Sequence, residues 1–241
     1  MTNNKLSQRL TTVLKYIPKD CIFADIGSDH AYLPIHAIKT RAVKGVIAGE
    51  VADGPFEAAK QNVKEHLLQH VIEVRKGDGL TVVKDSEVDC ITIAGMGGPL
   101  IASILEAGKE KLLSVERLIL QPNVAAQIVR KWLMSNGWQL VAEEILEEDG
   151  HIYEVLVADK GNPYVPYNDT EKELLFGPYL LQQNNSVFRK KWQREYTNWR
   201  QILKQISKGT ETSEIKRKRA ELTEYINWYL EVFANENSER S

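Results

Sequence analysis

The feature that most constrains this chain is an alternation of short apolar runs with longer, more polar segments before Gly137. The apolar runs occupy residues 21–27, 44–50, 71–77, 89–96 and 117–123. Most of the segments between them carry apolar residues at helical spacing. Short buried strands that alternate with helices are typical of βαβ units around a parallel sheet.

The pattern changes after Gly137. Residues 138–160 hold two strand-like segments joined by Glu148-Asp149-Gly150, and Asp-Gly between two strands is a hairpin signal. Five parallel strands followed by a hairpin is the arrangement of Rossmann-like class I methyltransferases, in which one strand of the sheet runs antiparallel. We therefore predict an α/β fold with a Rossmann-like methyltransferase domain at residues 1–161.

Residues 162–241 predict a different kind of structure. Residues 162–170 hold two prolines and no apolar period, which indicates a linker. Large apolar and aromatic residues then recur three or four positions apart from Phe188 to Ile206, and again from Leu222 to Phe233. This spacing predicts a coiled-coil-like arm of two helices that fold back on each other about Lys208-Gly209-Thr210.

The charge of the chain is unevenly distributed. The net charge is −2, but residues 170–220 hold 12 Lys or Arg and only 5 Asp or Glu. Such a surplus indicates a segment that meets a polyanion, although a solvated helical face gives the same composition. The candidate RNA contacts are two basic clusters: Arg189, Lys190 and Lys191, and Lys216, Arg217, Lys218 and Arg219.

Other features argue against several classes of protein. Only Cys21 and Cys90 occur, and no Cys/His cluster has metal-binding spacing. No apolar run reaches the roughly 18 residues that a membrane span needs, and MTNNKLSQRL lacks the apolar stretch of a signal peptide. We expect no metal, no membrane partner, a cytoplasmic location and a monomer.

Acidic residues stand at the ends of three predicted strands. Asp25 lies near the end of the first strand, Glu50 ends the second and Asp78 follows the third. Doubly wound sheets bind ligands at the carboxyl ends of their strands. There Asp25 suits a cationic group, Glu50 two ribose hydroxyls and Asp78 an adenine amino group, as in S-adenosylmethionine (AdoMet). Singly, each acid has an ordinary alternative, as a helix cap, a surface acid or a turn residue.

Glycines at the same strand ends allow a ligand to approach the backbone closely. The GxGxxG motif of dinucleotide sites is absent, which disfavours a nicotinamide oxidoreductase. The predicted cofactor-binding residues are Asp25, Gly27, Ser28, Glu50, Asp78, Gly79, Ala94, Gly95 and Met96.

Residues just beyond these positions form the predicted rim for the substrate. Asp29 and His30 follow the first strand and are the catalytic candidates. Asn123 ends the fifth strand and is equally suited to cap the next helix. The candidate substrate contacts of the rim are Gly97, Gly98, Gln121 and Asn123.

Together, DIGSDHAYLP, AGE, GDGL, AGMGG and QPN resemble the bacterial tRNA (adenine-22-N1)-methyltransferases of Gram-positive organisms, the TrmK-like family. The resemblance covers essentially the whole chain. It implies a Rossmann-like domain with a coiled-coil-like extension, AdoMet as methyl donor, and methylation at N1 of adenosine 22 in the D-arm region of tRNA.

The substrate comes from this resemblance alone, because the residue pattern by itself reaches only an AdoMet enzyme with a basic arm. Two alternatives stay open. One is an AdoMet-dependent methyltransferase of another RNA, and the other is a non-catalytic protein that binds AdoMet and RNA.

Overall fold

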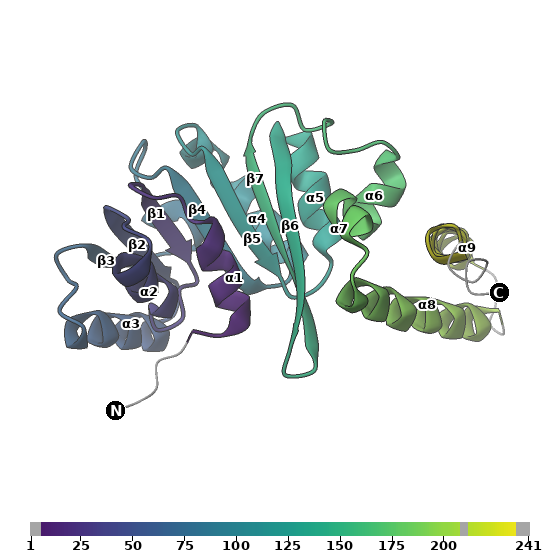
Figure 1. The fold of residues 1–241 in the computed structure, drawn as a ribbon, viewed down its shortest axis with the longest axis horizontal. Helices are drawn as coiled ribbons and strands as arrows, with labels where there is room; N and C mark the ends of the chain where they lie inside the picture. Colours follow the sequence, from purple (N-terminus) through teal and green to yellow (C-terminus); the bar gives the residue numbers. More distant parts are fainter. Residues whose placement is uncertain (1–5, 208–211, 235–241) are drawn as a thin grey trace.

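The computed structural model describes residues 6–207 and 212–234. Within these residues the strands form one seven-stranded sheet in the order β3-β2-β1-β4-β5-β7-β6, with helices on both faces (Figure 1). The strands are β1 (Ile22–Ile26), β2 (Gly45–Glu50), β3 (Ile72–Lys76), β4 (Cys90–Met96), β5 (Arg117–Pro122), β6 (Trp138–Glu148) and β7 (His151–Lys160).

The strand directions are those expected from the alternating pattern. β1 to β5 run parallel, and β7 pairs antiparallel with both β5 and β6. The prediction of a Rossmann-like sheet with one antiparallel strand is confirmed. Because the strand order reverses between β1 and β4, the carboxyl ends of these two strands border a crevice in which such folds bind ligands.

Helices cover the two faces of the sheet in two groups. α1 (Gln8–Tyr16), α2 (Tyr32–Thr40) and α3 (Asp53–Glu65) pack on one face, and α4 (Gly98–Ala107) and α5 (Ala126–Ser135) pack on the other. Two short 3-10 helices, η1 (Gly79–Val82) and η2 (Lys109–Leu112), complete this part of the fold. The mainly apolar β1, β2, β4 and β5 are buried on both sides, which fixes the positions of their carboxyl ends.

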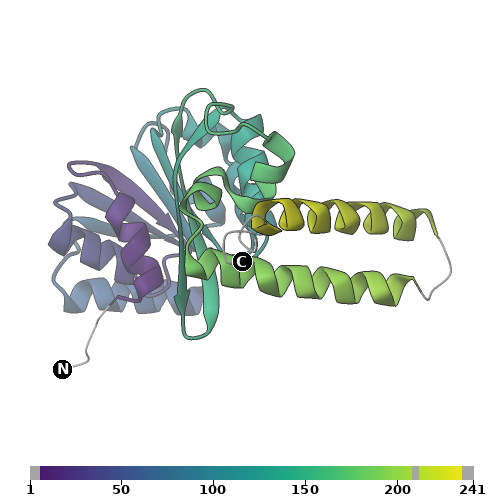
Figure 2. The ribbon, with the colours of Figure 1, turned by 45° about the vertical axis from the view of Figure 1, so that its right-hand side comes forward.

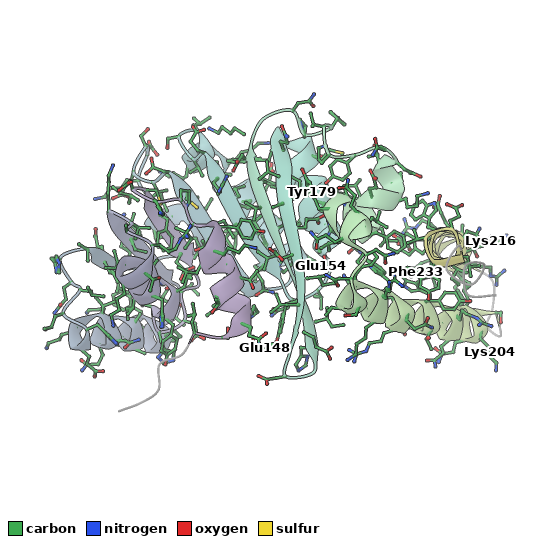
Figure 3. All side chains as sticks on the ribbon, viewed as in Figure 1. Glu148, Glu154, Tyr179, Lys204, Lys216 and Phe233 are labelled. Carbon is green, nitrogen blue, oxygen red and sulfur yellow. The ribbon has the colours of Figure 1, made fainter. Side chains whose placement is uncertain are left out.

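The β6–β7 hairpin reaches past the end of the sheet and supports α1. The carboxylate of Glu148 accepts hydrogen bonds from the backbone N–H groups of Gln8, at 2.6 Å, and Arg9, at 3.1 Å. A carboxylate at a helix N-terminus satisfies otherwise unpaired N–H groups and complements the helix dipole. Figure 3 shows Glu148 beside the lower end of α1.

The C-terminal part contains four helices within the described residues. α6 (Thr170–Phe176) and α7 (Pro178–Gln183) pack against α5 and β6. α8 (Ser186–Ile206) and α9 (Ser213–Ala234) then extend side by side away from the sheet (Figure 2). We call α8 and α9 the arm. The sequence pattern did not predict α6 and α7, because each of these helices within residues 170–183 is too short to show a periodic pattern of apolar residues.

Aromatic pairs show that α8 and α9 run antiparallel. Tyr196 stacks on Tyr229 with ring centroids 4.3 Å apart, and the rings of Phe188 and Phe233 lie 5.9 Å apart. The predicted helical hairpin and its apolar seam are therefore present. Its predicted turn, Lys208-Gly209-Thr210, lies outside the described residues.

Candidate active site

The carboxylate of Asp25 is buried at the end of β1. Its side chain accepts hydrogen bonds from Thr92 Oγ1, at 2.6 Å, and Ser28 Oγ, at 2.7 Å. Burial disfavours the charged form and raises the pKa of Asp25 to about 6. Both donors are neutral hydroxyls, and no ion pair reaches this carboxylate within the described residues, so the site is short of positive charge.

The chain leaves β1 through a turn of unusual backbone conformation. Asp29, His30 and Ala31 have φ angles of +40°, +63° and +57°. Residues with a Cβ rarely adopt this left-handed region, and those that do concentrate at functional sites. Glu50 Oε1 accepts from Asp29 N at 2.5 Å, and Asn62 Nδ2 donates to His30 O at 2.7 Å, which holds the turn in place.

This turn gives the two catalytic candidates their positions. The side chains of Asp29 and His30 are 83% and 47% exposed, with His30 Nε2 3.6 Å from Asp29 Oδ1. The His30 ring also stacks on Tyr32, with centroids 5.5 Å apart. Both candidates are therefore open to solvent just beyond the carboxyl end of β1, whereas Asp25 is buried.

Glu50 and Asp78 lie beside Asp25 along the same edge, because the parallel registers of β1 with β2 and of β2 with β3 bring the strand ends together. Glu50 is buried, and burial raises its pKa. Asp78 is exposed at the end of β3, directly before Gly79. The structure thus groups the three predicted acids, two of them buried and one at the surface.

Gly27 and Met96 bring the ends of β1 and β4 into close approach. Gly27 has a φ of +70°, and a Cβ added there would lie 2.3 Å from Met96 Cε. A larger residue at position 27 would be strained and would also displace the Met96 side chain. The predicted residues from β1 and β4 therefore face one crevice.

A chain of side-chain amides fixes the loop at the end of β4. Gln121 Oε1 accepts from Gly95 N, at 3.0 Å, and from Arg9 Nη1, at 2.5 Å. Gln121 Nε2 donates to Asn123 Oδ1 at 3.2 Å, and Asn123 Nδ2 donates to Gly95 O at 2.8 Å. Because an arginine can only donate, Arg9 determines which way each amide points. Gln121 is fully buried and positions Gly95, whereas Asn123 is exposed at the rim.

The β4–α4 and β5–α5 loops touch through Gly98. Gly98 N donates to Val124 O at 2.9 Å, and a Cβ on Gly98 would lie 2.2 Å from Ala125 O. Gly98 is buried in this contact, and Gly97 beside it is half-buried. Asn123 does not cap α5, because Ala125 is the N-cap residue and no side chain caps the helix.

A second group of buried charges lies where the arm meets the sheet. Arg130 is fully buried and donates to Glu143 Oε1, at 2.7 Å, and to Glu154 Oε2, at 2.8 Å. Glu154 also pairs with Lys191 of α8. We call these four residues the joint cluster. Figure 3 shows Glu154 on the central hairpin, between the sheet and the arm.

The two glutamates of the joint cluster differ in the number of cations they meet. Burial alone would raise the pKa of Glu154, but Lys191 and Arg130 together offset it and leave this pKa below its usual value. Glu143 meets Arg130 alone, so burial prevails and its pKa stays raised. The cluster therefore holds carboxylates whose charge is largely compensated within the protein.

The two basic clusters of the arm have different surroundings. Lys190 pairs with Glu147 of β6 at 2.6 Å, and Lys191 pairs with Glu154, so these two lysines join the arm to the hairpin. Residues 216–219 lie near the start of α9, at the outer end of the arm (Figure 2). The clusters therefore stand at opposite ends of the arm, as the antiparallel pairing requires.

Several residues of the site were missed from the sequence. Thr92 could have been selected from the sequence, because it is a polar residue inside an otherwise apolar strand. Arg130 could have been selected too, because it occupies the buried stripe of α5 with Val129 and Leu133. Arg9 could not, since its role depends on the packing of α1 against β5 and β7.

Comparison with known proteins identifies the family. The family model TrmK, described as tRNA (adenine(22)-N(1))-methyltransferase, matches residues 23–231. The chain belongs to the TrmK family. This membership agrees with the family resemblance of the sequence motifs.

Relatives within the TrmK family are similar over nearly their whole length. The tRNA (adenine(22)-N(1))-methyltransferase of Bacillus subtilis (strain 168) is 50% identical over 234 residues, which are 96% of this chain and 98% of the relative. The crystal structure of the B. subtilis m1A22 tRNA methyltransferase TrmK has a TM-score of 0.91, covering 95% of this chain and 99% of that one. A Streptococcus pneumoniae protein, solved in complex with S-adenosyl-L-methionine, is 41% identical with a TM-score of 0.83, over 95% and 99% of the two chains.

No group of three or more His, Cys, Asp or Glu side chains in residues 6–207 and 212–234 is arranged to hold a metal ion. Among the same residues, no helix is long and apolar enough to cross a membrane.

Proposed function

We propose that this chain transfers a methyl group from AdoMet to N1 of adenosine 22 in tRNA. The observation that carries the proposal is the edge where Asp25 and Glu50 lie buried with raised pKa values beside an exposed, strained turn. Buried acids that lack a cation suit a ligand that brings one. The substrate is inferred from family membership, because relatives of similar length are named for this reaction.

The acidic side chains at the carboxyl ends of β1, β2 and β3 have chemistry that fits AdoMet. The Asp25 carboxylate can compensate a ligand cation, Glu50 can accept from ribose hydroxyls, and Asp78 can accept from the adenine amino group. Gly27 lets the end of β1 approach the Met96 side chain closely, because a Cβ at this position would lie 2.3 Å from Met96 Cε. When bound, AdoMet supplies an electrophilic methyl group.

The protein's part in the reaction is to position the base and to stabilise charge. N1 of adenine carries a lone pair, so no base is needed before attack, but a paired adenine cannot present this atom. Extruding the base costs roughly a few kcal/mol. N1 would gain a bond to the methyl group as the bond between that group and the sulfonium sulfur breaks, so S-adenosylhomocysteine would leave and the adenine ring would become cationic. Asp29, exposed at the mouth of the crevice, is our candidate for stabilising that positive charge, with His30 beside it.

The basic residues of the arm supply the positive electrostatic potential that the acidic edge of the sheet lacks. We propose that Lys216, Arg217, Lys218 and Arg219 contact tRNA phosphates, with Arg189, Lys190 and Lys191 closer to the sheet. Each phosphate contact changes the slope of log affinity against log salt by about −0.9 on duplex DNA and about −0.7 on single strands. Reversing the four charges at 216–219 should flatten this slope for tRNA, whereas parallel lines for variant and wild type would remove the RNA role of this cluster.

The function itself is tested with labelled AdoMet. Full-length protein is incubated with two transcripts of one tRNA, which carry adenosine or guanosine at position 22, and the digested nucleosides are separated. We expect labelled 1-methyladenosine from the first transcript alone. Label in the second transcript, or in a different nucleoside, would contradict the proposal. We further propose a monomer that acts in the cytoplasm, which light scattering and cell fractionation would check.

A further inference from the structure

A cavity of about 200 Å³ lies between the β5–α5 loop and α8, outside the crevice described above. None of Asp25, Glu50 and Asp78 lines it. Its walls come from the loop, from the start of β7 and from the arm: Asn123, Val124, Ile152, Lys191, Arg194 and Glu195. We call it the flanking pocket.

The flanking pocket adjoins the rim of the crevice through Asn123. The Asn123 side chain donates to Gly95 O at 2.8 Å, and its backbone N–H donates to Met96 O at 2.8 Å. The same residue is therefore part of the β4 loop network and of the pocket wall. The flanking pocket therefore lies directly beside the rim at which the target base is proposed to enter.

The wall formed by the arm is held in place by the joint cluster. Glu154, which also lines the pocket, joins Lys191 of α8 to the fully buried Arg130. Because both carboxylate oxygens of Glu154 are occupied, this wall is preformed and does not depend on the ligand. A preformed pocket loses less entropy when a ligand is ordered in it.

The lining suits a nucleotide. Ile152 provides an apolar surface, and the side chain of Arg194 is 54% exposed with only a distant contact of 4.0 Å to Glu147. A planar guanidinium can stack on a base or donate to a phosphate. The volume is below the roughly 300 to 1,000 Å³ of pockets for drug-sized ligands, which limits the occupant to about one nucleoside.

We propose that the flanking pocket holds a nucleotide next to the methylated adenosine, with its base between Ile152 and the guanidinium of Arg194. This inference rests on the proposed function. It gives the enzyme a second point of contact on the strand, which would hold the extruded target base in register with the crevice.

The test uses full-length protein and tRNA that carries 2-aminopurine on either side of position 22. Binding of wild type should change the fluorescence at one flanking position. Ile152→Trp, which fills the pocket, should abolish that change and weaken tRNA binding about tenfold, with the AdoMet dissociation constant unchanged. Ile128→Trp is the matched control, because Ile128 is exposed on α5 and does not line the pocket.

A second pair of variants keeps the test decisive if Ile152→Trp does not fold. Arg194→Ala should weaken tRNA binding about fivefold and reduce the fluorescence change, whereas Arg200→Ala removes the same charge from α8 outside the pocket. Equal effects of these two variants would mean a general charge effect and overturn the pocket. If the wild-type protein methylates adenosine 22 but neither 2-aminopurine probe changes its fluorescence, the pocket proposal is overturned and the proposed function stays intact.

Discussion

The sheet edge that holds Asp25 and Glu50 and the joint cluster both bury two carboxylates, but only the joint cluster pairs its carboxylates with cations. At the edge, Asp25 and Glu50 accept from neutral donors and have raised pKa values. In the joint cluster, Glu143 and Glu154 surround Arg130, and Lys191 adds a second cation. Burial of an acid therefore does not by itself mark a ligand site; the missing counter-charge does.

The difference has an energetic meaning. A compensated buried ion network contributes little net stability, yet breaking it leaves a charge with no partner. An uncompensated buried carboxylate destabilises the free protein until a cation arrives. Binding of AdoMet at this edge, as proposed, would offset that cost.

The largest effect is expected at the joint cluster. Arg130→Met removes the cation between Glu143 and Glu154, which should lower the free energy of unfolding by about 3 to 5 kcal/mol. Urea denaturation at pH 7 measures it. Lys131→Met, at the exposed neighbouring position, is the control and should change stability by less than about 0.5 kcal/mol. A loss below about 1 kcal/mol for Arg130→Met would mean that the two carboxylates are not held as charges.

Removing a buried acid from the sheet edge that holds Asp25 should raise the free energy of unfolding instead of lowering it. The folded pKa of Asp25, about 6, lies above the ordinary value of 3.8 for an aspartate, so the ionised carboxylate destabilises the fold at pH values above this window. Asp25→Asn should stabilise the ligand-free protein by about 2 kcal/mol at pH 8, and the gain should vanish below about pH 4. Thermal unfolding at both pH values tests this, and a destabilised variant at pH 8 would refute the contrast between the two regions.

AdoMet affinity should depend on pH through the same group. A cationic ligand favours ionised Asp25, whose pKa is raised to about 6 by burial. Affinity should therefore fall about tenfold between pH 7 and pH 5, as the carboxyl becomes protonated. Calorimetry across this range gives the profile, and Asp25→Asn should make it nearly flat. An affinity that rises toward pH 5 would argue that Asp25 does not meet the cationic part of the ligand.

The smallest effect is expected at the exposed acid of the edge. Asp29 is 83% exposed, so its charge acts through water and contributes about 1 kcal/mol at most. Asp29→Ala should lower kcat about fivefold with the AdoMet dissociation constant unchanged, and Asp29→Glu should recover part of the loss. A much weaker AdoMet affinity with a normal kcat at saturating AdoMet would instead place Asp29 in the cofactor site.

The sheet was predictable because strands and helices are encoded in local apolar periods, and the acids were predictable because they lie at or just after the ends of those strands. The amide chain through Gln121 was not, since Arg9 lies more than 100 residues away in sequence. Lys190 and Lys191 are a related case. Their charge was evident from the sequence, but their pairing with Glu147 and Glu154 depends on how α8 meets the hairpin.

The contact of Glu148 with the N-terminus of α1 joins two segments that are made far apart in time. Residues 8 and 9 are about 140 positions ahead of Glu148 in the chain. At roughly 5 to 20 residues per second, a ribosome needs about 7 to 28 s to synthesise the stretch between them. α1 therefore cannot make this contact until β6 has been synthesised. During that interval its apolar side, including Val13 and Ile17, is available to chaperones.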